Sequence, residues 1–225
     1  MPKAEMEFTG ERLVPGKTPQ DIYKEHIDRY IFAASMVEHK NVLDIACGTG
    51  YGTGYMVEHG AARVIGADVS VETVRFAHDW YSIDSRTDFI SADGTRLPFA
   101  SDSFDAVVSF ETLEHIAAFY SFLDECRRVL KEDGLLICST PNRRIFSPSV
   151  DTPPNPFHVK EFWVEEFEHL LGNYFGTISL YGQCDVTLAD NSVERECGVG
   201  EFRNDDQVSS AYIIAIARDK LNTPR

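Results

Sequence analysis

Short apolar runs alternate with segments of helical periodicity along most of this 225-residue chain. The runs with strand character are residues 42–46, 63–68, 87–92, 104–110, 135–140, 175–183 and 211–218. Several segments between them carry apolar residues at the three- and four-residue spacing of a helix, and one such helix, from Phe119, is expected to stop near Gly134. Strands that alternate with helices form a parallel sheet with helices on both faces. We therefore predict a doubly wound α/β fold with a mostly parallel sheet of about seven strands.

One domain is the expected organisation, because 225 residues fill one large core but not two catalytic domains. Residues 21–38 show helical spacing behind a turn-rich segment, which predicts an N-terminal arm and cap helix over residues 1–40. Residues 41–225 then form the main body of the domain. Within it, residues 185–210 are polar, acidic and without periodicity, which indicates a long connection between the last two strands.

The charge balance argues against several classes of partner. The chain has 36 acidic and 21 basic residues and a formal net charge of −15, so its field repels phosphate backbones and anionic lipid surfaces. We therefore expect no nucleic acid and no membrane among its partners. No apolar run approaches the roughly 20 residues that span a bilayer, and the first residues lack the apolar core of a signal peptide. These features favour a cytoplasmic protein.

The cysteines suggest neither a disulfide framework nor a zinc site. They are odd in number, widely spaced and never arranged as CxxC; they are Cys47, Cys126, Cys138, Cys184 and Cys197. Cys184 and Cys197 flank a polar stretch and could pair, but reduced thiols are expected in a cytosolic protein.

A glycine-rich turn follows the first apolar run. Gly48, Gly50 and Gly52 let the backbone approach a ligand closely where side chains would block it, which implies a nucleotide-like ligand. A dinucleotide dehydrogenase would need GxGxxG, but Thr53 occupies the third glycine position. Asp44, inside the preceding strand, is also foreign to that fingerprint.

Acidic residues also end the next two strands. Asp68 ends the run at 63–68, where a carboxylate can accept hydrogen bonds from both hydroxyls of a ribose. Asp93 follows the third strand beside Gly94, and an adenine amino group would be a natural partner. An aspartate at a strand end can instead cap the next helix, but acids at three successive strands favour a ligand.

In this order, the motifs resemble those of the class I S-adenosylmethionine (SAM)-dependent methyltransferases with a type 11-like domain. The matching segments are DIACGTGYG, GADVS, SADGTRLPFASDSFDAVVSFETLEHI and RRVLKEDGLLICSTPN, within residues 41–142. The resemblance implies a Rossmann-like fold with an antiparallel last strand. It also implies that residues 41–225 form the SAM-binding methyltransferase domain, with S-adenosylhomocysteine (SAH) as the product.

The resemblance further implies contacts to the methionine and ribose parts of SAM. Asp44 would stabilise the glycine turn near the methionine amino group. Gly48 and Gly50 would line the methionine and the ribose. Asp68, with Val69 beside it, would hold the ribose hydroxyls.

On the adenine side, the resemblance implies that Asp93 binds the adenine N6. The backbone of Gly94 and Thr95 would support this contact. Phe110 and Glu111 would form the wall near the sulfonium.

The chemistry of methyl transfer limits what else is needed. SAM carries an activated methyl group, so neither a metal nor a covalent nucleophile is required, and we expect no metal site. A base is required only when the accepting atom keeps its proton at neutral pH. The best candidate is His115, which a helical turn would place on the same face as Glu111, whose carboxylate would orient the imidazole. The alternative is that His115 merely packs or caps beside core residues.

Three further residues are candidates for contact with the acceptor. His158 lies in a proline-rich loop that could fold over the acceptor, and Tyr23 and Tyr30 lie on the N-terminal helix. Anchoring of the loop and packing in the core are the alternatives for these residues.

The sequence therefore predicts a SAM-dependent O- or N-methyltransferase that acts on a small molecule, for example a sugar or a natural-product intermediate. A peptide or protein acceptor, a SAM-binding regulatory protein without turnover, and a nicotinamide enzyme are the alternatives. The oligomeric state does not follow from the sequence.

Overall fold

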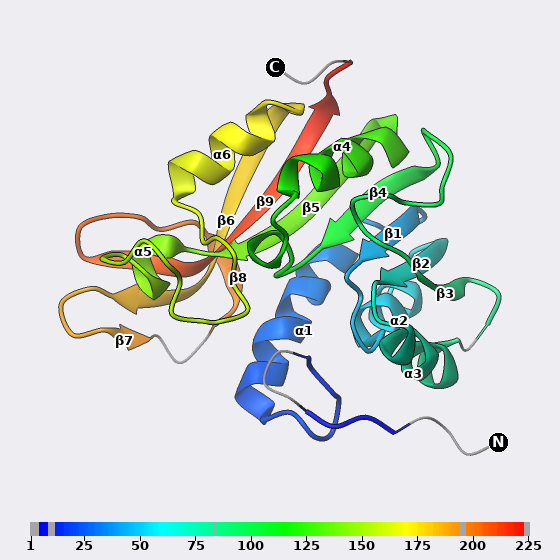
Figure 1. Ribbon diagram of the computed structural model, residues 1–225, viewed down its shortest axis with the longest axis horizontal. Coiled ribbons are helices and arrows are strands. Elements are labelled where there is room, and N and C mark those ends of the chain that lie inside the picture. Colours follow the sequence, from blue (N-terminus) through cyan, green and yellow to red (C-terminus); the bar gives the residue numbers. More distant parts are fainter. Residues whose placement is uncertain (1–4, 9–11, 83, 194–196, 223–225) are drawn as a thin grey trace.

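A twisted sheet with helices on both sides forms the body of the computed structural model (Figure 1). The structure describes residues 5–8, 12–82, 84–193 and 197–222. The helices are α1 (Gln20–Ala34), α2 (Tyr51–Glu58), α3 (Val71–Tyr81), the 3₁₀ helix η1 (Leu113–His115), α4 (Phe119–Val129), α5 (Arg143–Phe146) and α6 (Val164–Gly172). The strands are β1 (Asn41–Ile45), β2 (Arg63–Asp68), β3 (Thr87–Ser91), β4 (Phe104–Ser109), β5 (Leu130–Pro141), β6 (Phe175–Thr187), β7 (Ser192–Val193), β8 (Val199–Glu201) and β9 (Val208–Lys220).

The strand order is β3-β2-β1-β4-β5-β9-β6-β7, and β8 pairs with β6. Strands β1 to β5 pair in parallel, whereas β9 lies antiparallel to both β5 and β6. The predicted doubly wound, mostly parallel sheet with an antiparallel last strand is therefore confirmed. The chain moves outward from β1 to β3 and then returns to the other side of β1 at β4. The point where the order reverses is where ligands bind in open α/β sheets.

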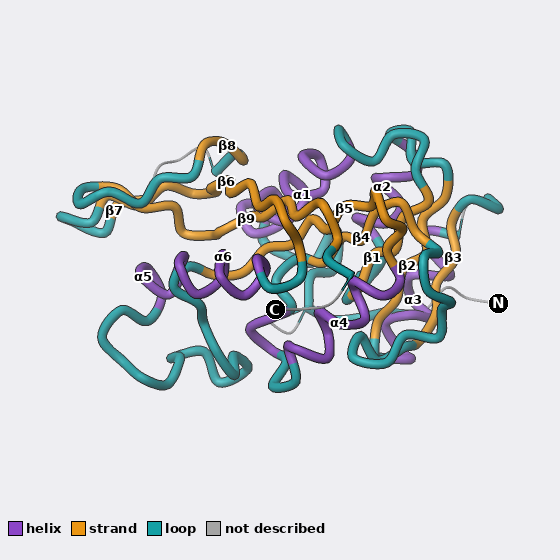
Figure 2. Tube along the Cα trace, turned by 90° about the horizontal axis from the view of Figure 1, so that it is seen from above, coloured by secondary structure: helices purple, strands orange, loops and turns teal. Residues whose placement is uncertain are grey.

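The core explains why the central strands read as continuous apolar runs. Successive residues of β4 face opposite sides of the sheet, so Val107 packs with α4 and α6, while Ala106 and Val108 pack with α1 and α2. Figure 2 shows these helices on opposite sides of the strands. Because both faces are covered, a central strand of this sheet carries apolar residues at most of its positions. Among the described residues, no helix is both long and apolar enough to cross a bilayer.

The boundary between α4 and β5 differs from the prediction. The helix ends at Val129 rather than near Gly134, and the strand begins at Leu130. Leu130 pairs with Phe104, and the register then shifts before Ala106 pairs with Leu135. Because of this irregularity, the polar residues between Leu130 and Leu135 belong to the strand. The sequence pattern did not predict this longer strand.

The long connection predicted over residues 185–210 is shorter than expected and contains two short strands. Strand β6 continues to Thr187 and β9 begins at Val208, and these two residues pair with each other. The two strands extend as a ribbon away from the rest of the sheet, with β7 and β8 beside them (Figure 2). The apolar face of this ribbon is small, a cluster of Cys184, Val186 and Ala211, so its sequence resembles that of a polar loop.

The expectation that all five cysteines are reduced is also wrong. Cys184 and Cys197 form a disulfide with their Cα atoms 4.0 Å apart. Strand β8 pairs antiparallel with β6, and Gln183 lies opposite Val199, so this pairing brings the two cysteines together. The remaining cysteines are buried free thiols: Cys47, Cys126 and Cys138.

Candidate functional site

A cavity of about 930 Å³ opens at the carboxyl ends of β1, β2 and β4. Its wall comes from the β1–α2 turn, the end of β2, the segment after β4, helix α1, and the loop between α5 and α6. This volume lies near the upper end of the range for small-molecule and cofactor sites, roughly 300–1,000 Å³. The cavity therefore occupies the position expected from the strand order.

Two glycines of the β1–α2 turn have different environments. Both have left-handed backbones, with φ of +55° at Gly48 and +85° at Gly50. A Cβ atom on Gly48 would meet no protein atom within 4 Å, and this residue lines the cavity. A Cβ on Gly50 would lie 2.7 Å from Cβ of Ala77 and 2.8 Å from the ring of Phe89. Gly48 thus faces the cavity, whereas Gly50 permits close packing behind it.

Asp44 braces the turn from within the core. Its buried carboxylate accepts hydrogen bonds from Thr53 Oγ1 at 2.5 Å and from the Tyr30 hydroxyl at 3.2 Å. Burial raises the pKa of Asp44 to about 7. Thr53, in the position where a dehydrogenase has glycine, therefore supplies a hydroxyl that Asp44 needs. Tyr30 lines the cavity, but its hydroxyl donates its hydrogen bond to Asp44.

Asp68 connects the end of β2 to the glycine turn. One carboxylate oxygen accepts the Gly48 N–H at 3.1 Å, and the other accepts the Ser70 N–H at 2.9 Å. Each carboxylate oxygen has two lone pairs, so both can accept a further hydrogen bond from a ligand in the cavity. The neighbouring Val69 side chain is exposed.

The structure does not bring Asp93 and Gly94 to the cavity wall. Asp93 is exposed and accepts hydrogen bonds from the backbone N–H and the hydroxyl of Thr95, and these bonds lower its pKa. A Cβ on Gly94 would lie 2.9 Å from the ring of Phe122, so this glycine permits core packing. Their contact with adenine stays a prediction.

Beyond β4, Phe110 and Glu111 both line the cavity. Glu111 has a left-handed φ of +49°, and its carboxylate accepts a hydrogen bond from the Ser139 hydroxyl at 2.6 Å. Arg29 of α1 lies 3.9 Å from the same carboxylate and stacks on the ring of Tyr212. Its guanidinium is buried and has no hydrogen-bond partner among the described residues. Arg29 was not among the predicted site residues.

The predicted helical pairing of Glu111 with His115 is wrong. Helix η1 begins only at Leu113, and the left-handed backbone places Glu111 outside it. The carboxylate next to His115 belongs to Glu114 instead, with 3.9 Å between Glu114 Oε1 and His115 Nε2. The other imidazole nitrogen of His115, Nδ1, is hydrogen-bonded to the carbonyl of Phe157 at 2.9 Å. A catalytic role of His115 stays a prediction.

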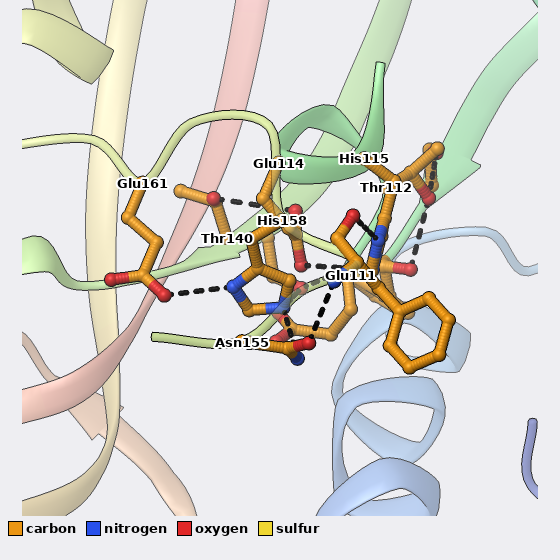
Figure 3. A network of polar contacts seen from close by, with 12 residues as sticks. Glu111, Thr112, Glu114, His115, Thr140, Asn155, His158 and Glu161 are labelled. Carbon is orange, nitrogen blue, oxygen red and sulfur yellow. Dashed lines mark hydrogen bonds and ion pairs between the residues drawn. The ribbon is translucent and has the colours of Figure 1, made fainter. Parts of the chain in front are cut away.

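Glu114, His115 and His158 form a polar cluster at the cavity wall (Figure 3). The imidazoles of His115 and His158 meet edge to face, with 4.9 Å between ring centres. His158 Nδ1 lies 2.7 Å from Glu161 Oε1, and His158 Nε2 lies 3.0 Å from the amide nitrogen of Asn155. The proline-rich loop thus brings His158 to the cavity wall, and its contact with an acceptor stays a prediction.

Glu114 is a further residue of the cavity wall that was not predicted from the sequence. Its carboxyl group is buried, and Oε1 has no hydrogen-bond partner within the part of the chain that the structure describes. Burial, followed by the charge of Glu111, raises the pKa of Glu114 well above its usual range. The available signal was an acidic residue directly between Leu113 and His115, in a stretch that otherwise reads as core.

Helix α1 presents other residues to the cavity than those predicted. Tyr23 packs against Tyr51, with 5.8 Å between ring centres, and is not part of the cavity wall. Glu25 and His26 line the cavity instead. Burial, followed by the charge of Arg29, lowers the pKa of His26 to about 3, so this imidazole is neutral at physiological pH.

Comparisons with known sequences find methyltransferases among the proteins that are similar to this chain. Residues 43–138 match a family model described as a methyltransferase domain. The chain is 38% identical over 165 residues to a probable S-adenosylmethionine-dependent methyltransferase of Mycolicibacterium smegmatis, a match that covers 73% of this chain and 63% of the relative. It is 37% identical over 117 residues to a ubiquinone biosynthesis O-methyltransferase of Cereibacter sphaeroides, covering 52% of this chain and 47% of the relative. The chain spans less than two thirds of the length of both relatives.

Among solved structures, a SAM-dependent methyltransferase of Thermotoga maritima has the same fold, with a TM-score of 0.67. The two chains are 16% identical, and the match covers 89% of this chain and 94% of the other. At this identity, the likeness concerns the fold alone.

Proposed function

The chain belongs to the class I SAM-dependent methyltransferase family, whose cofactor is SAM, and on this premise we propose that it methylates an oxygen or nitrogen atom of a small molecule. The observation that carries the proposal is the composition of the cavity wall. The glycine turn and Asp68 form one part of the wall, and the polar cluster of Glu114, His115 and His158 forms another. A bound cofactor and a polar acceptor atom can therefore share the same cavity.

Two features of the wall fit SAM. Gly48 leaves room at the end of β1, where a side chain would occupy the cavity. Asp68 offers carboxylate lone pairs at the end of β2, the position from which a ribose is held in folds of this kind. When bound, SAM would supply a methyl group on a cationic sulfur, and transfer would leave SAH, the methylated acceptor and one proton.

His115 is the proposed group on the acceptor side. Because a carbonyl oxygen only accepts hydrogen bonds, the contact with Phe157 requires the proton of a neutral imidazole to be on Nδ1. The lone pair is then on Nε2, in a side chain that lines the cavity. Such a lone pair can remove a proton from an acceptor or bind a cation.

The acceptor is proposed to be a small molecule with an apolar part and a hydroxyl group. Phe146 and Phe157 line the cavity although they are 39% and 60% exposed, which provides an apolar border for such a molecule. A relative is named a ubiquinone biosynthesis O-methyltransferase, and this name fits a hydroxyl compound as the acceptor.

The test is formation of SAH from SAM with a panel of phenols, sugars, amines and peptides. We expect acceptor-dependent turnover with at least one hydroxyl compound and loss of turnover in Asp68→Ala. The exposed His78 on α3 provides the control variant, and His78→Ala should keep the wild-type rate. Turnover with peptides alone would contradict the small-molecule proposal, and SAH binding without turnover on any acceptor would support a regulatory protein.

A further inference from the structure

The polar cluster unites residues from two segments of the chain. Glu114 and His115 belong to η1, and His158 belongs to the loop between α5 and α6. The Glu114 carbonyl accepts the N–H of Val159 at 2.6 Å, which ties this loop to η1. Each of the three side chains offers one ligand atom, and these atoms all lie within 4.8 Å of one another. Figure 3 shows the three side chains close to one another, and all three line the cavity.

The carboxyl group of Glu114 is buried and poorly hydrogen-bonded. It is 1% exposed, and Oε1 has no hydrogen-bond partner among the described residues. Its other oxygen receives a long contact of 3.4 Å from the Thr140 hydroxyl. A buried polar atom without a partner costs about 1–3 kcal/mol, and more when it is charged. A cation would remove this cost.

Both imidazoles are held in the orientation typical of metal ligands. A histidine that binds a metal usually donates its second ring N–H to a carbonyl or a carboxylate. Nδ1 of His115 lies 2.9 Å from the Phe157 carbonyl, and Nδ1 of His158 lies 2.7 Å from the Glu161 carboxylate. Nε2 is therefore the ligand atom of each ring.

We propose that Glu114, His115 and His158 bind a divalent metal ion of the first transition row. Two imidazoles and one carboxylate are a known set for such ions, and they leave a coordination position open. Ligand atoms of a tetrahedral zinc site lie about 3.3 Å apart. Nε2 of His115 and Oε1 of Glu114 are 3.9 Å apart, so small side-chain rotations complete the site. The contact of His158 Nε2 with Asn155 is replaced when the ion binds.

A second group of candidate ligands, Glu25 with Cys184 and Cys197, is less suitable. Its two sulfur atoms are joined in the disulfide and offer no thiolate. The polar cluster also borders the cavity, where an ion has a chemical use.

The inference rests on the proposed function and specifies its acceptor. A metal ion lowers the pKa of a hydroxyl group that it binds. The acceptor's O–H bond breaks, its proton goes to the solvent, and the oxygen lone pair forms the new bond to the methyl carbon. The electron pair of the broken C–S bond stays on sulfur. The lone pair of His115 then binds the ion rather than a proton, and the acceptor is a hydroxyl compound.

Calorimetric titration of the chelator-treated full chain with Zn²⁺ tests the site. We expect one equivalent to bind, with affinity reduced about tenfold or more in Glu114→Gln and in His158→Ala. Glu161→Gln, which leaves all three ligands in place, should weaken binding about 10- to 100-fold by releasing the His158 ring. His169→Ala, at an exposed histidine of α6, is the control and should bind Zn²⁺ like the wild type. Mg²⁺ should bind more weakly, because it prefers oxygen ligands.

The thermal midpoint with Zn²⁺ and a titration with SAH separate the metal site from the proposed function. Zn²⁺ should raise the thermal midpoint of the wild type and of His169→Ala but have little effect on Glu161→Gln, a variant that changes no ligand. Absence of stoichiometric Zn²⁺ binding, or equal Zn²⁺ affinity in the wild type, Glu114→Gln and His158→Ala, would overturn the metal site. SAH titration of the same samples tests the proposed function separately. Bound SAH without bound Zn²⁺ would overturn only the metal site, whereas bound Zn²⁺ without bound SAH would overturn only the proposed function.

Discussion

Separate replacement of Gly48 and Gly50 by alanine should damage two different properties of the glycine turn. Both residues have positive φ, +55° and +85°, so each alanine pays a conformational cost of roughly 1–2 kcal/mol. At Gly50 the new Cβ would also lie 2.7 Å from Ala77 and 2.8 Å from Phe89. Such overpacking adds about 1–3 kcal/mol. Gly50→Ala should therefore be less stable than Gly48→Ala by about 1–3 kcal/mol.

The effect on cofactor binding should have the opposite order. The Cβ of Gly48→Ala meets no protein atom within 4 Å and enters the cavity, so it should weaken SAH binding by about tenfold or more, a loss of roughly 1.4 kcal/mol. Folded Gly50→Ala should bind SAH with nearly wild-type affinity. Urea denaturation measures the stabilities, and calorimetric titration measures the affinities. Equal stabilities of the two variants, or wild-type SAH affinity in Gly48→Ala, would refute this assignment of the two glycines.

Three further predictions concern buried groups. The pKa of Asp44 is raised to about 7 in the folded state, whereas the unfolded carboxyl ionises near 4, so stability falls by up to about 4 kcal/mol as the pH rises from about 4 through about 7. Asp44→Asn should therefore gain stability relative to the wild type between pH 5 and pH 8 in urea denaturation, and a constant difference would contradict the burial of this charge. The pKa of His26 is lowered to about 3, so the unfolded chain binds more protons and stability falls as the pH drops below about 6.5. His26→Gln should reduce this loss, and an identical acid profile would show that His26 is not its source. Finally, the chain denatured without reductant should contain three reactive thiols, whereas five would exclude the disulfide between Cys184 and Cys197.

The sequence predicted the elements whose signal is apolar periodicity. Strands β1, β4 and β5 are buried on both faces along most of their length, so their runs of apolar residues identified them. The ribbon of β6 and β9 is held beyond the sheet by backbone pairing, for which the side chains give no pattern. The sequence left a bond between Cys184 and Cys197 open but favoured reduced thiols, because the pairing of β6 with β8 that brings them together was not predicted.

At the site, the sequence placed residues at strand ends but did not determine where their side chains point. Asp68 bonds to the glycine turn and faces the cavity, whereas Asp93 closes a local turn with Thr95. Glu111 was expected next to His115, but its left-handed backbone directs it to Ser139, and Glu114 takes that position. A single backbone conformation outside the helical region therefore changed which carboxylate belongs to the polar cluster.

The most direct test of the cofactor site is calorimetric titration of SAH into the wild type, Asp68→Ala and a control variant. Asp88→Ala, at an exposed aspartate of β3, is the matched control. We predict that SAH binds the wild type and Asp88→Ala with a Kd below about 1 mM, and that Asp68→Ala binds at least about tenfold more weakly. Absence of SAH binding to the wild type, or unchanged affinity in Asp68→Ala, would contradict the proposed site.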